Sequence, residues 1–325
     1  MMDGKTELTL NVVIPTYRPD DKFERLMSGL IRQTCPPKKI ILMNTEKSLF
    51  SYEDMLSVWQ QQSKGCTEIE IHHIEQKDFD HAATRRKGLE YADADVVLFM
   101  TEDAIPVDER LTESLLDVLR KQPDVAVAYA RQMPGRDCTW AEREARRFNY
   151  PAKSRKKTAA DLDELGIRTF FCSDVCAAYR KERFLELGGF PDHAIFNEDM
   201  VYASKVIHSG DAVYYCADAK VIHSHNYTGL QQFHRNFDLG VSHREFREVF
   251  DAYPAEGTGI RMVMGQSKTM LSRLDFIGLV RLWYVSGCKY VGYRLGKMYD
   301  RLPKKLVLAC TTNPGYFESH IRPNR

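Results

Sequence analysis

The 325-residue sequence lacks the glycine motifs of the commonest nucleotide-binding folds. No GxGxxG follows the first strand-like segment and no GxxxxGK[ST] occurs anywhere, which argues against a dinucleotide dehydrogenase and a P-loop NTPase. None of the eight cysteines has CxxC or other zinc-type spacing, so the cysteines do not indicate a zinc site. If a nucleotide binds, the loop after the first strand and the end of the second strand must hold it.

Charge and hydrophobicity argue against a nucleic-acid-binding protein and against a membrane-spanning one. The formal net charge is only +1, so no overall field favours a nucleic acid as the partner. The longest apolar stretches fall well short of the roughly 20 residues that cross a bilayer. No signal peptide is recognisable at the N-terminus, and we therefore expect reduced cysteines and a cytoplasmic protein.

The chain does contain a short apolar run that ends in two carboxylates. Residues 96–100 (VVLFM) predict a strand buried on both faces of a parallel sheet, and Glu102 and Asp103 follow directly. Open α/β sheets bind their ligands at the carboxyl ends of such strands. Hard cations such as Mg²⁺ prefer carboxylate and phosphate oxygens. A metal site is one interpretation, and a solvated strand end is the other.

Strand-like and helix-like segments alternate over the first hundred residues. Strands are predicted over 8–14, 39–43 and 68–74, and a helix over 23–31 begins after Asp20 or Asp21 as its N-cap. A strand, a helix and a strand at this spacing form a right-handed parallel unit. This part of the chain therefore predicts a nucleotide-binding α/β half-domain.

The second half continues the pattern with one basic interruption. Helices are predicted over 111–119, 181–187 and 200–208, and strands over 125–130, 212–217 and 219–222, with a buried apolar segment over 170–179. Gly188 and Gly189 are a helix-terminating signal. Residues 153–157 (KSRKK) predict a loop, which is either a solvated linker or a mobile lid over a donor diphosphate.

Two further groups of residues could carry chemistry. Glu198 and Asp199 stand at the start of a predicted helix, where a helix N-terminus stabilises carboxylates whether or not they have a function. His223 and His225 are two apart on an extended segment, so their side chains point to the same face. Either histidine could complete a metal site, or both could be structural.

Together these motifs are more specific than any one of them. A strand ending in PTYRP (15–19), the TED at 101–103, a GGF segment followed by NEDM (197–200), and HSHNY (223–227) resemble a family 2 glycosyltransferase with the GT-A fold. The resemblance is closer to the bacterial rhamnosyltransferase-like branch. It rests there on FDHAATR (79–85), RFNYP (147–151), FFCSDVCAAYR (170–180) and QQFHRNFD (231–238). The resemblance implies a mixed, mostly parallel sheet flanked by helices, and the composition after residue 255 adds a C-terminal helical extension to this expected fold.

The resemblance also assigns roles to residues. It implies Asp103 as the ligand of Mg²⁺ or Mn²⁺, completed by His223 or His225, and Asp199 with Glu198 as the catalytic pair, Asp199 being the base. The expected donor-binding residues are Pro15, Thr16, Tyr17, Arg18, Asn44, Glu46, Arg85 and Glu102. Thr101 replaces the first aspartate of the family's DxD motif, and Asn236 replaces the tryptophan of the QxxRW motif, which argues against processive synthesis.

The implied reaction is an inverting, metal-dependent transfer of rhamnose or a similar hexose. The expected donor is a dTDP- or UDP-linked sugar, and the acceptor is a glycan or a lipid-linked glycan in cell-surface polysaccharide synthesis. Two other functions remain open. Thr101 favours an inactive relative that binds a nucleotide or glycan within an assembly. A sugar nucleotidyltransferase would carry a glycine-rich, basic loop where this chain has PTYRPDD.

The last seventy residues differ in composition. We expect a catalytic domain over 1–255, with a nucleotide-sugar half to about 105 and an acceptor half after it, and an extension over 256–325. From Arg261 onward there are 12 basic residues and three acidic ones. Helices are predicted over 271–282 and 285–298. Such a segment suits the anionic inner face of the cell membrane, the catalytic domain, or a second subunit in a homodimer.

Overall fold

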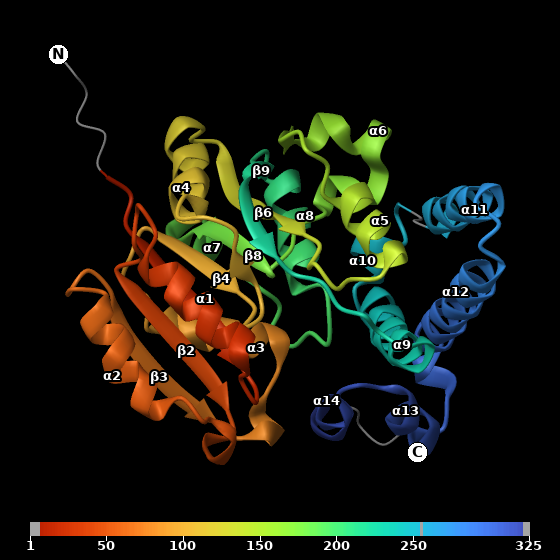
Figure 1. Cartoon of the computed structure of the whole chain (residues 1–325), viewed down its shortest axis with the longest axis horizontal. Coiled ribbons are helices and arrows are strands. Elements are labelled where there is room, and N and C mark those ends of the chain that lie inside the picture. Colours follow the sequence, from red (N-terminus) through yellow and green to blue (C-terminus); the bar gives the residue numbers. More distant parts are fainter. Residues whose placement is uncertain (1–6, 254–255, 321–325) are drawn as a thin grey trace.

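The computed structural model describes residues 7–253 and 256–320, in which helices flank a nine-stranded sheet (Figure 1). The strands are β1 (Leu10–Thr16), β2 (Lys39–Thr45), β3 (Glu68–Ile74), β4 (Val96–Met100), β5 (Ile105–Pro106), β6 (Val125–Met133), β7 (Arg155–Lys157), β8 (Cys176–Arg180) and β9 (Ala212–Ile222). The helices are α1 (Asp21–Ile31), α2 (Glu53–Gln62), α3 (His81–Glu90), α4 (Leu111–Lys121), α5 (Trp140–Asn149), α6 (Leu162–Leu165), α7 (Lys181–Glu186), α8 (Glu198–His208), α9 (Gly229–Glu245), α10 (Arg247–Phe250), α11 (Glu256–Ser272), α12 (Phe276–Gly296), α13 (Lys304–Cys310) and α14 (Pro314–His320).

The sheet order is β3-β2-β1-β4-β8-β6-β9-β5, and β7 pairs with β9. Strands β1 to β4 pair in parallel, β8 runs against both β4 and β6, and β9 is parallel to β6. The sheet is therefore mixed and mostly parallel, as predicted. The carboxyl ends of β1, β2 and β4 meet at one edge, which is where the predicted donor residues lie.

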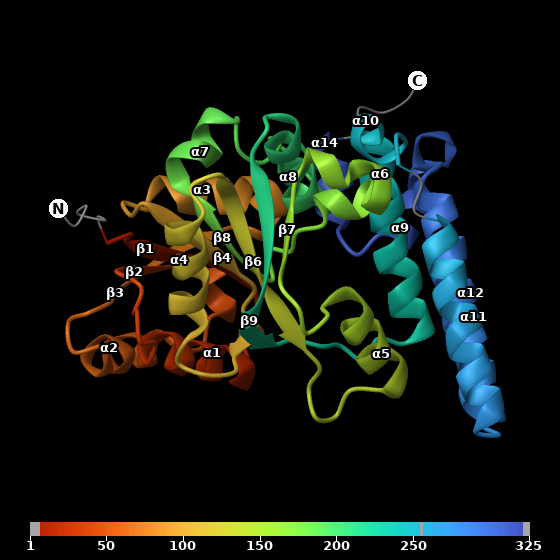
Figure 2. The same ribbon diagram turned by 90° about the horizontal axis from the view of Figure 1, so that it is seen from above.

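The apolar run at β4 is buried on both faces. All five of its residues are fully buried, and successive side chains alternate between two cores. Leu98 and Met100 pack with α1, α2 and α4, whereas Val97 and Phe99 pack with α3, α7 and α8. Figure 2 shows α1 and α2 on one side of the sheet and α3, α7 and α8 on the other. This double coverage explains why β4 has no polar residue.

The predicted capping signals at Asp20 and at Gly188 and Gly189 are confirmed, and the structure adds a cap at Asp80. Asp20 caps α1 by accepting from the backbone N–H of Lys22, and Asp80 caps α3 through Ala82 and Ala83. Gly188 and Gly189 follow α7 with φ of +73° and +56°, the left-handed region that glycine enters without strain.

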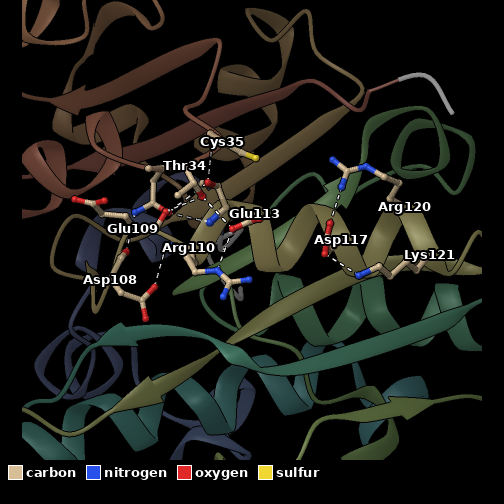
Figure 3. Close-up of polar contacts among 11 residues, drawn as sticks. Thr34, Cys35, Asp108, Glu109, Arg110, Glu113, Asp117, Arg120 and Lys121 are labelled. Carbon is tan, nitrogen blue, oxygen red and sulfur yellow. Dashed lines mark hydrogen bonds and ion pairs between the residues drawn. The ribbon is translucent and has the colours of Figure 1, made fainter. Parts of the chain in front are cut away.

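The turn after α1 is tied to the start of α4 (Figure 3). The backbone N–H of Thr34 donates to the carbonyl of Glu109 at 2.7 Å, and its hydroxyl contacts a carboxylate oxygen of Glu113 at 3.1 Å. The hydroxyl of Thr112 donates to the carbonyl of Cys35 at 2.7 Å. These bonds hold the segment between β5 and α4 against the turn after α1. The loop that carries Asp103 between β4 and β5 is therefore anchored at its far end.

The prediction of a loop over 153–157 was wrong for residues 155–157. Arg155–Lys157 form β7, which pairs antiparallel with β9, and Lys157 is 3% exposed. The two short strands predicted over 212–217 and 219–222 are one strand, β9. A register shift beside β6 between Cys216 and Lys220 accounts for the apparent break. The charge-rich stretch after β6 contains α5, which has no buried residue and which the sequence pattern did not reveal.

The C-terminal helices also differ from the prediction. The break falls between Ser272 and Phe276, not at Trp283 and Tyr284, so α11 and α12 form one long helical hairpin. Helix α12 packs closely on α9. A Cβ added at Gly292 or Gly296 would lie 2.2 or 2.0 Å from the carbonyl oxygens of Phe233 and Phe237. Of the basic residues counted in the extension, Arg322 and Arg325 lie outside the described residues. No described helix combines the length and apolar composition needed to cross a membrane.

Candidate active site

The loops after β1 and β4 are joined by a hydrogen bond. The backbone N–H of Tyr17 donates to a carboxylate oxygen of Glu102 at 3.0 Å. Tyr17 is 37% exposed and Arg18 is exposed, with the guanidinium 5.2 Å from the Tyr17 ring centroid. Burial, followed by the nearby Asp103 charge, raises the pKa of Glu102 to about 8. Glu102 is therefore mostly protonated at neutral pH and can donate a hydrogen bond.

The other predicted nucleotide residues have supporting positions. Thr16 and Asn44 are buried and bonded to each other at 3.1 Å, and Asn44 also contacts His73 at 2.9 Å. Pro15 lies inside β1, in register with Met43 of β2. The structure therefore places Pro15, Thr16 and Asn44 beneath the surface that Tyr17 and Arg18 present.

Glu46 holds the end of β2 in a bend. Its φ is +65°, and one of its carboxylate oxygens accepts from the backbone N–H of Gln76 at 2.6 Å. Its own N–H donates to the carbonyl of Ile74 at 2.8 Å. The carboxylate of Glu46 thus bridges the ends of β2 and β3 at the edge of the nucleotide loop.

Asp103, His223 and His225 form a cluster at the end of β4. Their nearest ligand atoms all lie within 4.8 Å of one another. Nε2 of His225 is 3.2 Å from Asp103 and 3.0 Å from Nε2 of His223, which is 3.5 Å from Asp103. These three side chains come from segments 120 residues apart, and β5 and β6 pairing with β9 brings them together.

The protonation states of this cluster suit a cation. Burial lowers the pKa of His223 to about 3 and also lowers that of His225, so both imidazoles are neutral. Burial acts to raise the pKa of Asp103, any positive charge on the facing histidines acts to lower it, and the net pKa is lowered, so the carboxylate is ionised. Two neutral imidazoles and one carboxylate are a recognised ligand set for a divalent metal.

Gln132 orients His223. Its side-chain carbonyl oxygen lies 2.9 Å from Nδ1 of His223 and also accepts from Arg146, while its amide contacts Ser173 at 2.9 Å. An Nδ1–H donated to this oxygen leaves the Nε2 lone pair directed at the cluster. Second-shell partners of this kind fix the tautomer of metal-binding histidines.

Asp199 lies at the N-terminus of α8 as a half-buried carboxylate. It accepts from the backbone N–H of Asp174 at 3.1 Å and from that of Met200 at 2.7 Å. Burial, followed by the neighbouring Glu198 charge, raises the pKa of Asp199 to about 7. A carboxylate with this pKa can accept a proton near neutral pH.

Arg85 and Glu198 are buried and paired with each other. Their charged atoms are 2.9 Å apart, and Arg85 also faces Asp174 at 3.5 Å. Burial raises the pKa of Asp174 well above its usual range, and Tyr179 donates to it at 2.5 Å. Arg85, which the resemblance assigned to donor binding, and Glu198, which it assigned to the catalytic pair, thus form a buried network behind Asp199.

A hydrogen-bonded path joins the two halves of the site. Gln132 contacts His223 on one side and Ser173 on the other, and Asp174, the next residue, donates to Asp199. The backbone N–H of Thr101 donates to the carbonyl of Val175 at 3.2 Å, which ties the same segment to β4. The metal-type cluster and the candidate base are therefore fixed relative to each other.

Arg235 on α9 is a candidate site residue to which the sequence analysis gave no role. Its guanidinium lies 4.8 Å from the ring centroid of Tyr227 and 5.2 Å from that of Phe196. The Tyr227 ring stacks on His225. Among the residues that the structure describes, no carboxylate forms an ion pair with Arg235. Its place in QFHRN, the match to QxxRW, was the only signal in the sequence.

Comparison with known proteins identifies the class to which this fold and site belong. The glycosyl transferase family 2 model matches residues 11–188, and the chain belongs to that family. It is a glycosyltransferase with the GT-A fold. Its fold is similar to that of a mannosyltransferase from Pyrobaculum calidifontis solved with GDP-Man and Mn²⁺, with a TM-score of 0.53, 16% identity, and coverage of 94% of this chain and 80% of that one.

Two relatives identify the branch of the family. The chain is 36% identical to the O-antigen chain rhamnosyltransferase RfbN of Salmonella typhimurium over 91% of this chain and 92% of RfbN. It is 34% identical to the O-antigen chain rhamnosyltransferase WbaN of Salmonella anatum, over 91% of each chain. The enzyme is therefore a rhamnosyltransferase-like glycosyltransferase. The nucleotidyltransferase alternative is excluded by this membership.

Proposed function

We propose that the protein transfers rhamnose or a similar hexose from a nucleoside-diphosphate donor to a hydroxyl of an O-antigen-type acceptor, with inversion of the anomeric centre. The names of its relatives support the sugar and the acceptor. A glycan linked to a lipid carrier is the acceptor form we favour. The observation that carries the proposal is the bonded path from the Asp103 cluster to Asp199, which fixes a candidate base beside a candidate diphosphate site.

The donor half of the reaction uses the edge formed by β1, β2 and β4. Tyr17, Arg18 and Glu102 are exposed or half-buried there, and we assign them to the base and ribose of a dTDP- or UDP-linked sugar. Thr16, Asn44 and Glu46 hold this edge in shape. Arg235 has a guanidinium suited to the oxygens of a diphosphate and no competing carboxylate partner among the described residues.

Asp103, His223 and His225 are the residues that would hold a divalent metal. A metal bound there would neutralise charge on the leaving diphosphate. The set contains two nitrogens and one carboxylate, and it therefore favours a transition ion such as Mn²⁺ over Mg²⁺, which prefers an all-oxygen site. The mannosyltransferase with the similar fold was solved with Mn²⁺.

Asp199 is the proposed base. It would take the proton of the acceptor hydroxyl as that oxygen attacks the anomeric carbon from the side opposite the diphosphate. One displacement of this kind inverts the centre, by the same geometry that distinguishes inverting from retaining hydrolases. Glu198 is a positioning residue in this scheme, because its carboxylate is already paired with Arg85 behind Asp199.

We place the reaction in the cytoplasm, because all eight cysteines lie in the described residues as free thiols, which a reducing compartment maintains. The test is a transfer assay with dTDP-rhamnose, UDP-linked hexoses and a lipid-linked O-antigen precursor, with and without Mn²⁺. We expect a metal-dependent product whose new bond has the opposite anomeric configuration to the donor. A retained configuration, or donor binding without turnover on any acceptor, would contradict the proposal.

A further inference from the structure

Large exposed apolar side chains gather on the α11–α12 hairpin. The end at which the two helices join carries five of them, which we call the hairpin tip: Leu271, Leu274, Phe276, Ile277 and Val280. Leu274 is 74% exposed and Ile277 is 85% exposed. Single exposed apolar residues are ordinary, but a contiguous group of this kind marks an interaction surface.

The tip has a defined local structure. Asp275 caps α12 by accepting from the backbone N–H of Gly278 at 2.8 Å, and Leu274 has φ of +56°, which is unfavourable for a branched side chain. On the inner side of the hairpin, Met270 and Leu282 are buried. The outward apolar side chains are therefore presented by a folded turn.

Most charged residues of the hairpin itself are basic, whereas Glu144 of the neighbouring α5 lies in one pocket with Arg261 and Arg273. Residues 259–296 contain six basic residues and one acidic residue, Asp275, which is used as the cap. The basic residues are Arg261, Lys268, Arg273, Arg281, Lys289 and Arg294. Apolar and aromatic side chains mixed with lysine and arginine are the composition of segments that lie in the interface of an anionic bilayer.

The hairpin reaches beyond the body of the enzyme. Figure 2 shows α11 lying over α12 along one edge of the molecule, with one end of the pair projecting past α9. The contacts of Gly292 and Gly296 with α9 hold the other half of α12 on the catalytic part of the chain. The tip is thus a projecting element on a firmly attached base.

We propose that the hairpin tip inserts into the headgroup region of an anionic phospholipid bilayer, with the surrounding basic residues on the phosphates. A second copy of this chain is a poorer occupant. A two-fold contact would place the same basic residues opposite one another. The binding requires neither donor nor metal, so it can be tested separately from the proposed reaction.

The test is flotation of the full chain with phosphatidylcholine vesicles, with and without phosphatidylglycerol. Ile277→Asp with Val280→Asp removes the apolar contact, and Lys268→Glu with Arg281→Glu reverses the charge. Leu185→Asp on α7 is the apolar control, at 57% exposed, and Arg25→Glu with Lys87→Glu is the charge control. Because all these positions are exposed, the circular dichroism and melting temperature of each variant should match the wild type.

We expect wild type and both controls to float with phosphatidylglycerol-containing vesicles, and each tip variant to lose at least about tenfold in partitioning. Added salt should weaken the binding of the wild type to phosphatidylglycerol-containing vesicles until it equals the binding to vesicles of phosphatidylcholine alone. Equal flotation of all variants would overturn the proposal. So would a wild-type dimer in light scattering that Ile277→Asp with Val280→Asp makes monomeric, because the tip would then be a subunit interface.

Discussion

At the scale of single residues, the chemistry of the candidate active site depends on which side chains carry protons. Asp199 is held by two backbone N–H groups, yet burial and Glu198 raise its pKa to about 7. Glu102, with a pKa of about 8, stands as a protonated neighbour of an ionised Asp103. Adjacent carboxyl groups with opposite protonation allow one to bind a cation while the other donates a hydrogen bond.

We expect Asp199→Asn to lower kcat by a factor of about 100 or more and to leave donor binding intact, because the amide keeps the shape but cannot take a proton. In the wild type, the rate should fall about tenfold per pH unit below 7 as Asp199 becomes protonated. Transfer rates between pH 5 and 9 measure both effects. Asp192→Asn, at an exposed position, is the control, and unchanged kcat in Asp199→Asn would remove Asp199 as the base.

Gln132 gives a prediction for metal binding. Gln132→Leu removes the oxygen that orients His223, and we expect Mn²⁺ affinity to fall about 10- to 100-fold. Titration calorimetry with Mn²⁺ on the folded variant would measure this, with exposed Gln62→Leu as the control. Unaltered Mn²⁺ affinity would show that His223 needs no orientation by Gln132.

At the scale of elements, the sequence predicted the helices and strands that have an ordinary apolar pattern. It missed β7, whose buried residue is a lysine. The bounds of β3 and β4 and the cap of α1 followed from periodicity and capping alone, because local pattern and tertiary packing agree there. Strand β7 was missed because KSRKK has no apolar residue. The whole Lys157 side chain is buried, with its amino nitrogen 5.0 Å from the ring centroid of Tyr129 and 5.8 Å from that of Phe171.

Some residues of the candidate site could likewise be proposed from the sequence, and others could not. Asp103, Asp199 and the two histidines could be proposed from the sequence because each stands at a recognisable strand or helix boundary and within a motif that resembles the family. The buried pairing of Arg85 with Glu198 and the orienting role of Gln132 could not be found. Both depend on contacts between segments that are 91 to 113 residues apart in the chain. No local pattern encodes such pairings.

Lys157 gives a prediction for β7. Burial lowers its pKa from 10.5 to about 7, so between these values the unfolded chain binds the proton more readily than the folded one. The resulting destabilisation is largest below pH 7 and disappears as the pH approaches 10.5. Lys157→Met should therefore raise the free energy of unfolding at pH 7 by on the order of a few kcal/mol, less the contribution of the lost bond to Phe171, and the gain should shrink at pH 10. A difference that is independent of pH would contradict a buried, neutral Lys157.

At the scale of the whole molecule, the C-terminal helices share a core with the catalytic part. Ile195, Phe237 and Val241 pack with Val307 and Phe317, and the buried Asp238 accepts from Thr311 at 2.6 Å. The division at residue 255 expected from composition therefore crosses a packed interface. Removal of the residues after 255 would expose this apolar cluster and leave Asp238 without its bonds to Thr311 and Thr312.

A chain truncated after residue 255 should melt at lower temperature and lose activity, because both the α9 contact and this cluster are removed. Thermal melts and donor binding would measure the loss. Co-expression of 256–325 as a separate chain should restore part of it by mass action. Full stability of the truncated chain would show that the extension is an independent unit.

The glycines of α12 provide a matched pair of substitutions. Gly296→Ala should destabilise the protein by about 1–3 kcal/mol, because its Cβ would collide with backbone of α9. Gly287→Ala on the same helix meets nothing within 4 Å and should stabilise by up to about 1 kcal/mol through helix propensity. Urea unfolding would compare them, and equal effects would mean that α12 does not pack at this distance.

The glycine contacts also limit how this enzyme can change over evolution or in the laboratory. Helix α9 carries Arg235 toward the site, and its Gly240 meets the backbone of α12 at Tyr293. At these glycines the backbones of α9 and α12 are in direct contact. No side chain lies between them, so a larger or smaller side chain cannot adjust the distance between the two helices. Variation in acceptor choice must therefore come from loops and from the outer face of α9, while its distance to the rest of the fold stays constant.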